Sequence, residues 1–202
     1  EKKTKQVTSG FYSCYNPVFD SEGKYLYVLT SQTWQPYYSD ADNTFIYANS
    51  TQLAAIGLQK STPSLLVPKN DTVAVKQDEK PAAKPDDKKK DDKKKDDKTK
   101  TDTTAKDEKK DEVAAVAIDF DGMEQRMELL PVSPGNMGSL GAVKGKILYV
   151  RYPNTGSPDG QPSLKFYDID AREEKTILDG AGGYELSFNK EKMLVGKAGS
   201  WA

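Results

Sequence analysis

A short phrase recurs three times along this chain, and it restricts the possible folds more than any other feature. Each copy holds a short strand, a tight polar turn and a second, apolar strand, and the copies span residues 16–28, 138–150 and 184–195. Val143 and Phe188, which occupy matching places in the last two copies, lie 45 residues apart. A period near this length is typical of a β-propeller, because one four-stranded blade takes roughly 40–45 residues.

A second phrase supplies the outer strands of such blades. The predicted outer pairs are residues 53–59 with 65–67, 115–121 with 127–130, and 164–170 with 176–178. We therefore expect an all-β chain of antiparallel sheets, arranged as about two propeller blades and the start of a third. Residues 11–67 form one blade, residues 139–178 another, and residues 184–197 begin the third. The place of residues 115–130 stays open, with the outer edge of the first blade as one candidate.

Charge is concentrated in one segment. Residues 76–112 hold 14 lysines and 13 aspartates or glutamates, with almost no apolar side chain. Such a stretch cannot bury enough surface to offset the entropy of ordering, so it predicts a disordered insertion. Its near neutrality also argues against a nucleic-acid partner. The chain then divides into a first blade at 1–75, the insertion at 76–112, and continuing propeller strands at 113–202.

Two rare residue types limit the chemistry. Histidine is absent and Cys14 is the only cysteine, so the chain contains neither a Ser–His nor a Cys–His nucleophile pair, and no internal disulfide. No run of about 18 apolar residues occurs, so we expect no membrane insertion. We also expect no catalytic residue, no metal and no cofactor in this chain.

Aromatic side chains crowd into a long loop predicted at residues 31–50. Long loops in compact domains are often functional, and aromatic side chains suit contact with peptides. If any residues of this chain contact an oligopeptide, we expect them to be Trp34, Tyr37 and Tyr38. The alternative is that these rings cover the exposed edge of a blade.

The same loop carries an acidic cluster that invites a calcium interpretation. Asp40, Asp42 and Thr44 stand at alternate positions, as the first ligands of a calcium-binding loop do. The rest of that motif is missing, because Phe45 stands where a glycine makes the sharp turn and Thr51 where a bidentate glutamate belongs. A solvated loop edge is the preferred interpretation.

A set of motifs occurs in a fixed order outside the charged segment. They are Asn16-Pro17-Val18-Phe19-Asp20, Gly23-Lys24-Tyr25-Leu26-Tyr27, Ile118-Asp119-Phe120-Asp121-Gly122, Arg126, Leu130-Pro131-Val132, Pro134-Gly135-Asn136, Leu140, Val143, Gly145-Lys146, Leu148-Tyr149, Leu178, Gly180 and Tyr184-Glu185-Leu186-Ser187. In this order they resemble the amino-terminal β-propeller of the tricorn-type serine peptidases. The resemblance covers essentially everything except the charged segment.

The resemblance implies a role. Propellers of that family sit beside a serine peptidase core and act as gates or channels for oligopeptides, whereas the nucleophile and the general-base histidine belong to other domains. This chain is then a non-catalytic part of a larger peptidase, its partners are oligopeptides and the remaining domains, and the parent is a homo-oligomer. We expect a bacterial periplasm or cell envelope, with the cytoplasm as the alternative. Two blades and a beginning are fewer than a closed ring needs.

Two other functions remain open at this point. One is a propeller that holds a protein partner in the cell envelope. The other is an independent enzyme that works with carboxylates alone, as glycosidases do, with two acids flanking a cleft. Its candidates are Asp119 and Asp121, expected to share one face of a strand, and Asp168 and Asp170.

Overall fold

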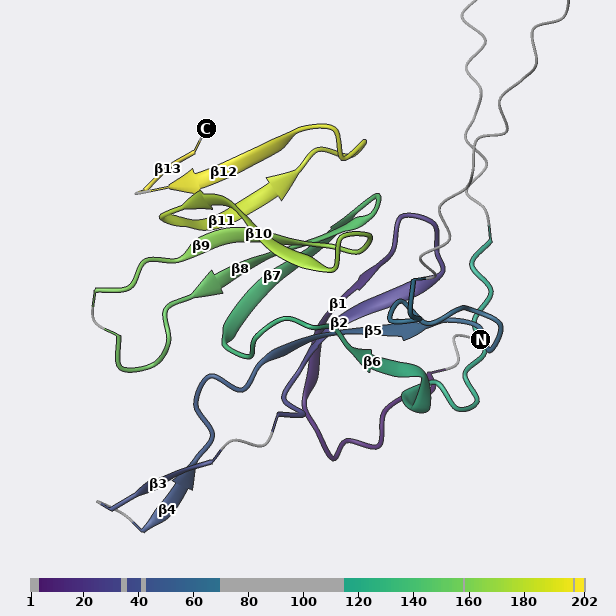
Figure 1. Ribbon diagram of the computed structural model, residues 1–202. Coiled ribbons are helices and arrows are strands. Elements are labelled where there is room, and N and C mark those ends of the chain that lie inside the picture. Colours follow the sequence, from purple (N-terminus) through teal and green to yellow (C-terminus); the bar gives the residue numbers. More distant parts are fainter. Residues whose placement is uncertain are drawn as a thin grey trace, which may run out of the picture. The chain divides into compact units, whose positions relative to one another are not determined.

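The structure is a computed structural model that describes residues 4–33, 36–40, 43–69, 115–157, 159–197 and 199–201 (Figure 1). The chain divides into two units, Glu1–Pro68 with Ala115–Ala202, and Lys69–Ala114. Of the second unit only Lys69 is described, so the predicted insertion at 76–112 lies outside the described residues. Within the described part, the first unit is built of strands and one short 3-10 helix, η1 (Glu124–Arg126).

The first sheet has four antiparallel strands in the order β1-β2-β5-β6. These strands are β1 (Cys14–Phe19), β2 (Tyr25–Thr30), β5 (Gln52–Gly57) and β6 (Met127–Leu129). Between β2 and β5 lies a separate two-stranded hairpin, β3 (Tyr37–Ser39) with β4 (Thr44–Ile46).

The second sheet has the order β10-β9-β8-β7, and the third is β11-β12-β13. Their strands are β7 (Asn136–Val143), β8 (Lys146–Tyr152), β9 (Ser163–Asp168), β10 (Glu173–Asp179), β11 (Ala181–Leu186), β12 (Met193–Lys197) and β13 (Ser200–Trp201). All pairings are antiparallel, and each sheet runs from its first strand outwards in chain order, as a propeller blade does. The predicted all-β, antiparallel architecture is confirmed.

The central strands are buried because neighbouring sheets face one another. Four consecutive residues of β2 (27–30) and four of β8 (147–150) are buried, so both faces of each strand are covered. One cluster of buried side chains draws on both the first and the second sheet, and its largest members are Tyr27, Tyr149 and Tyr167. Apolar burial between sheets is thus what holds them face to face.

Hydrogen bonds at a bulge in β7 also join the second sheet to its two neighbours. The side-chain oxygen of Asn16, on the first sheet, accepts a bond from the backbone of Leu140 at 2.7 Å. From the third sheet, the hydroxyl of Tyr184 donates to the carbonyl of Ser139 at 2.8 Å. Gly141 makes room for that phenol, because a Cβ at this position would collide with its oxygen. The bulge in β7 therefore holds hydrogen bonds to both neighbouring sheets, through Leu140 to the first and through Ser139 to the third.

Two predicted strands do not form. Residues 65–67 make a turn instead, in which Leu65 and Leu66 pack against the core while the backbone amide of Leu65 donates to Glu128. Residues 115–120 are also irregular. The fourth strand of the first sheet is β6, which pairs with β5. Of residues 115–130, whose place the sequence left open, only 127–129 therefore form the outer edge of the first blade.

Candidate functional site

The aromatic segment contains a hairpin rather than an open loop. In β3 and β4, Tyr38 stands opposite Phe45, and the two rings meet edge to face with centroids 5.7 Å apart. The Tyr38 hydroxyl also donates to the side chain of Asn43, which adopts a positive φ of 52° in the turn. The hairpin is therefore an ordered element whose rings remain largely in solvent.

The predicted peptide-contact residues do not share one surface. Tyr37 and Tyr38 are 63% and 57% exposed, and as neighbours on a strand they project to opposite faces of the hairpin. Trp34 lies outside the described residues. Each face of the hairpin therefore presents one exposed tyrosine beside an exposed apolar residue of β4, Tyr38 with Phe45 on one face and Tyr37 with Ile46 on the other.

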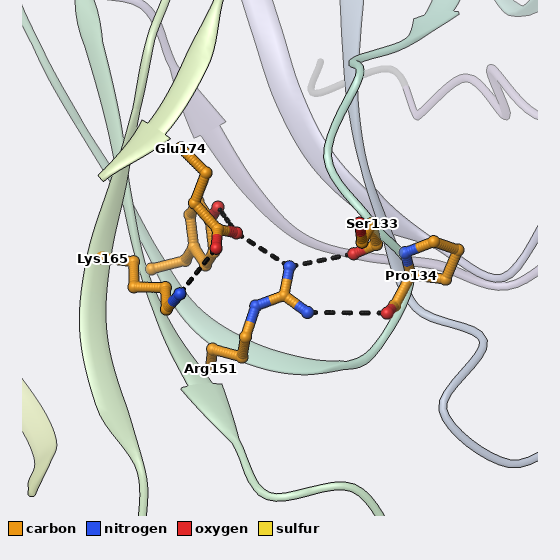
Figure 2. Close-up of polar contacts among 6 residues, drawn as sticks. Ser133, Pro134, Arg151, Lys165 and Glu174 are labelled. Carbon is orange, nitrogen blue, oxygen red and sulfur yellow. Dashed lines mark hydrogen bonds and ion pairs between the residues drawn. The ribbon is translucent and has the colours of Figure 1, made fainter. Parts of the chain in front are cut away.

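A half-buried polar cluster occupies the second sheet and was not predicted (Figure 2). Glu174 of β10 accepts hydrogen bonds from Lys165 of β9 at 2.6 Å, from Arg151 of β8 at 2.8 Å and from the hydroxyl of Tyr149 at 2.5 Å. Arg151 also donates to the backbone carbonyl of Ser133 at 2.9 Å, in the connection that leads into β7. The Glu174 carboxylate thus links β8, β9 and β10, and Arg151 links this group to the segment between the first and second sheets.

The electrostatics of this cluster favour a charged Glu174. Partial burial would raise the pKa of Glu174, but the hydrogen bonds from Lys165, Tyr149 and Arg151 outweigh it, so the pKa lies below its ordinary value of 4.5. Burial, helped by the bond to Glu174, raises the pKa of Tyr149 well above the usual range of a phenol. At neutral pH the carboxylate is ionised and the phenol is protonated, which is an arrangement for holding strands together rather than for moving protons.

The pH dependence of stability follows from this direction. A carboxyl whose pKa is lowered by folding stabilises the folded state above its unfolded pKa, and loses that contribution as pH falls through the folded value. We expect the stability difference between the wild type and Glu174→Gln to be largest above about pH 4.5 and to shrink at lower pH. Urea unfolding of both proteins from pH 3 to pH 7 measures this, and a difference that grows on acidification contradicts it.

The four acids considered for carboxylate catalysis are engaged in turns. Asp119 accepts a bond from the backbone of Lys60, and Asp121 pairs with the Lys60 ammonium in solvent. Because residues 115–120 form no strand, the predicted common face of Asp119 and Asp121 is wrong. Asp168 accepts bonds from the amides of Asp170 and Ala171 at the β9–β10 turn. The amide of Ala171 is the main reason for the lowered pKa of Asp168.

The three arginines have a structural role that the sequence analysis did not predict. The chain has only three arginines, against many lysines, and each donates to backbone carbonyls of a connecting segment. Arg126 bonds the carbonyls of Gly57, Leu58, Asp119 and Asp121; Arg151 those of Ser133 and Pro134; Arg172 that of Val67. The planar guanidinium offers several fixed donors, which lysine cannot replace.

Across the described ranges, no group of three or more Cys, Asp or Glu side chains is placed to hold a metal ion, and Asp42 lies outside those ranges. None of the helices in the described part is long and apolar enough to cross a membrane.

Known proteins provide the comparison for this fold. The whole chain, residues 1–202, matches the family described as the tricorn protease second beta propeller domain. Tricorn protease homolog 2 of Streptomyces coelicolor is 22% identical over 200 residues, which cover 94% of this chain and 15% of that protein. Tricorn protease homolog 1 of the same organism is 25% identical over 191 residues, which cover 90% of this chain and 16% of that protein.

The fold agrees with a solved structure. A crystal structure of the tricorn protease superposes with a TM-score of 0.61 at 18% identity, covering 95% of this chain and 16% of that one. The chain thus spans about 15–16% of the length of the relatives it matches. The predicted β-propeller fold is confirmed, whereas the predicted place in the amino-terminal propeller is corrected by the match to the second one. The chain belongs to the family of the tricorn protease second beta propeller domain.

Proposed function

We propose that this chain is a non-catalytic propeller segment of a tricorn-like serine peptidase, and that it gates or channels oligopeptides towards a catalytic core elsewhere in the parent protein. Its partners are then oligopeptides and the remaining domains of a parent that assembles as a homo-oligomer. The parent works in the periplasm or cell envelope of a bacterium, with the cytoplasm as the alternative.

Family membership and residue content support a role without catalysis. The relatives named as tricorn protease homologs are more than six times as long as the matched part, which leaves ample chain for a catalytic core. The 202 residues contain no histidine, so the usual general base of a serine peptidase is not among them.

The observation that carries a peptide-handling role is the β3–β4 hairpin. On each of its two faces it places an exposed tyrosine beside an exposed apolar residue of β4, and large apolar side chains that adjoin one another on a surface are typical of binding sites. Tyrosine rings give contact area at a low entropy cost, and the edges of a hairpin can hold an extended peptide. The hairpin therefore suits passing contact with peptides of varied sequence.

Replacing Trp34, Tyr37 and Tyr38 with alanine in the full-length protein tests this proposal. We expect kcat/KM for oligopeptides to fall about fivefold, since losing about 1 kcal/mol of contact energy changes a rate constant by roughly that factor. Steady-state hydrolysis of an unstructured peptide of about ten residues measures it.

The matched control is Phe11→Ala, which removes another highly exposed ring from the first unit. It should leave kcat/KM unchanged. Equal activity of the triple variant and the wild type would remove the hairpin from the mechanism. Loss of a stably bound protein partner, with peptide turnover unchanged, would instead favour the protein-binding module of the cell envelope.

A further inference from the structure

A groove lies between the second and third sheets and is lined by residues of both. The β7–β8 and β11–β12 turns lie at the same end of these two sheets (Figure 1). Its volume is about 240 Å³. The floor is apolar and comes from four strands, through Leu148, Phe166, Ile177 and Met193. The volume of the groove is less than the roughly 300–1,000 Å³ of a site for a drug-sized molecule, so the groove has room for one large apolar side chain and its neighbours.

The apolar side chains of the floor differ in how far they are exposed to solvent. Leu148 is 3% exposed, whereas Ile177 at the lip is 41% exposed. Phe166 and Met193 are half-buried between them. An apolar hollow of this kind is what a ligand side chain fills by displacing water.

The rim of the groove is cationic. Lys146 is neutralised by Asp168 at 3.4 Å, and its ammonium also lies 5.7 Å from the centre of the Phe166 ring. Lys190 and Lys192 line the same groove, and within the described ranges neither forms an ion pair. Glu191 stands between them and binds the side chain of Asn189. Two ammonium groups are thus left at the rim against one carboxylate.

The wall that carries these lysines is held in shape before any ligand arrives. The backbone of Ser187 donates to Lys192 at 2.9 Å, and the backbone of Lys190 donates to Ser187 at 2.8 Å. The Ser187 hydroxyl accepts from the Lys192 amide at 3.0 Å and contacts Asn189 at 2.7 Å. A preformed turn reduces the ordering cost of binding.

We propose that this groove binds an acidic oligopeptide segment, with one large apolar side chain on the floor and acidic side chains on either side of it facing Lys190 and Lys192. Two ammonium groups suit two carboxylates, which flanking acidic side chains supply and a single chain terminus does not. The proposal rests on the peptide-handling function above and names the class of peptide that this segment favours.

Photocrosslinking in the full-length protein tests the groove, after treatment with a serine-directed inhibitor so that no probe is cleaved. The probe is acetyl-Asp-benzoylphenylalanine-Asp-amide, and the comparison is the same peptide with both aspartates replaced by asparagine. We expect the acidic probe to label residues of the groove, by mass spectrometry, about tenfold more than the neutral one, because two ion pairs at a surface contribute about 1.4 kcal/mol together.

Variants locate the effect. Lys190→Glu with Lys192→Glu should lower labelling by the acidic probe about tenfold. Lys24→Glu with Lys60→Glu makes the same charge change on exposed lysines in turns beside the first sheet, and should not lower it. Ile177→Ser should weaken labelling by both probes. Melting curves establish that each variant is folded, and the comparison of the two probes on the wild type needs no variant.

Three results would overturn the proposal. The first is equal labelling by the acidic and neutral probes, and the second is labelling outside the groove only. The third is that the neutral peptide, made with a free carboxyl terminus instead of the amide, labels the groove more than the acidic probe does. None of these depends on turnover, so a failure here is distinct from a failure of the hairpin variants to change kcat/KM.

Discussion

Replacing Glu174 with alanine is expected to lower the free energy of unfolding of this domain by about 3 kcal/mol. The change removes one carboxylate and leaves Arg151 and Lys165, whose side chains are only 19% and 20% exposed, without their counter-charge. It also leaves the buried Tyr149 hydroxyl without its acceptor. Urea or thermal unfolding followed by circular dichroism measures the loss.

The neighbouring residue supplies the control. Glu173 lies on the same strand, but its carboxylate pairs with Lys175 in solvent, with side chains 64% and 50% exposed. We expect Glu173→Ala to change stability by less than about 0.5 kcal/mol. Similar losses for the two variants would mean that the cluster contributes no more than an ordinary surface ion pair.

Arg126→Ala is expected to cost about 2 kcal/mol. Arg126 donates to the carbonyls of Gly57 and Asp121 at 2.9 Å each, and also to those of Leu58 and Asp119. It thereby ties the end of β5 to residues 119–121, which precede η1 and the edge strand β6. One hydrogen bond from a charged donor is worth about 1.5–3 kcal/mol. Because the freed carbonyls of a partly exposed site can bond to water instead, we expect the net loss for the whole group to be about the value of one such bond.

Two variants separate geometry from charge at this position. Arg126→Lys keeps the charge but offers a single ammonium, so we expect it to recover less than half of the loss. Lys60→Ala removes a nearby cation that pairs with Asp121 in solvent, and should cost less than about 0.5 kcal/mol. Full recovery by lysine would show that charge alone, and not the fixed donors of the guanidinium, matters here.

Residues 65–67 and 115–120, which were wrongly predicted as strands, show that a short apolar run indicates burial but not pairing within a sheet. Leu65 and Leu66 are apolar because they pack against the core, and Ile118 packs against the outer face of the first sheet. Both segments therefore have the composition of strands, yet neither enters the ladder. The partner position beside β5 is taken by β6, whose three residues pair with Ala54, Ala55 and Ile56.

The candidate site was less predictable than the fold. The crowding of aromatic residues indicates the segment that contains Tyr37 and Tyr38, but it does not indicate the hairpin, in which the two side chains project to opposite faces. The groove was not predicted, because Phe166 and Met193 belong to different sheets and their sequence spacing says nothing about an intervening hollow. The rarity of arginine is visible in the sequence, and it is the one local signal that distinguishes Arg126 and Arg151 from the many lysines.

The sequence by itself determined the strands that recur and the residues buried within them. The repeated turn and apolar strand around Tyr25 and Ile147 define β2 and β8, because side-chain alternation and turn chemistry are local properties of the chain. Only the tertiary structure decided which strand closes the first sheet, which carbonyls the arginines bind, and where apolar floor and lysine rim come together. These depend on contacts between residues far apart in the chain, whose energies no local pattern encodes.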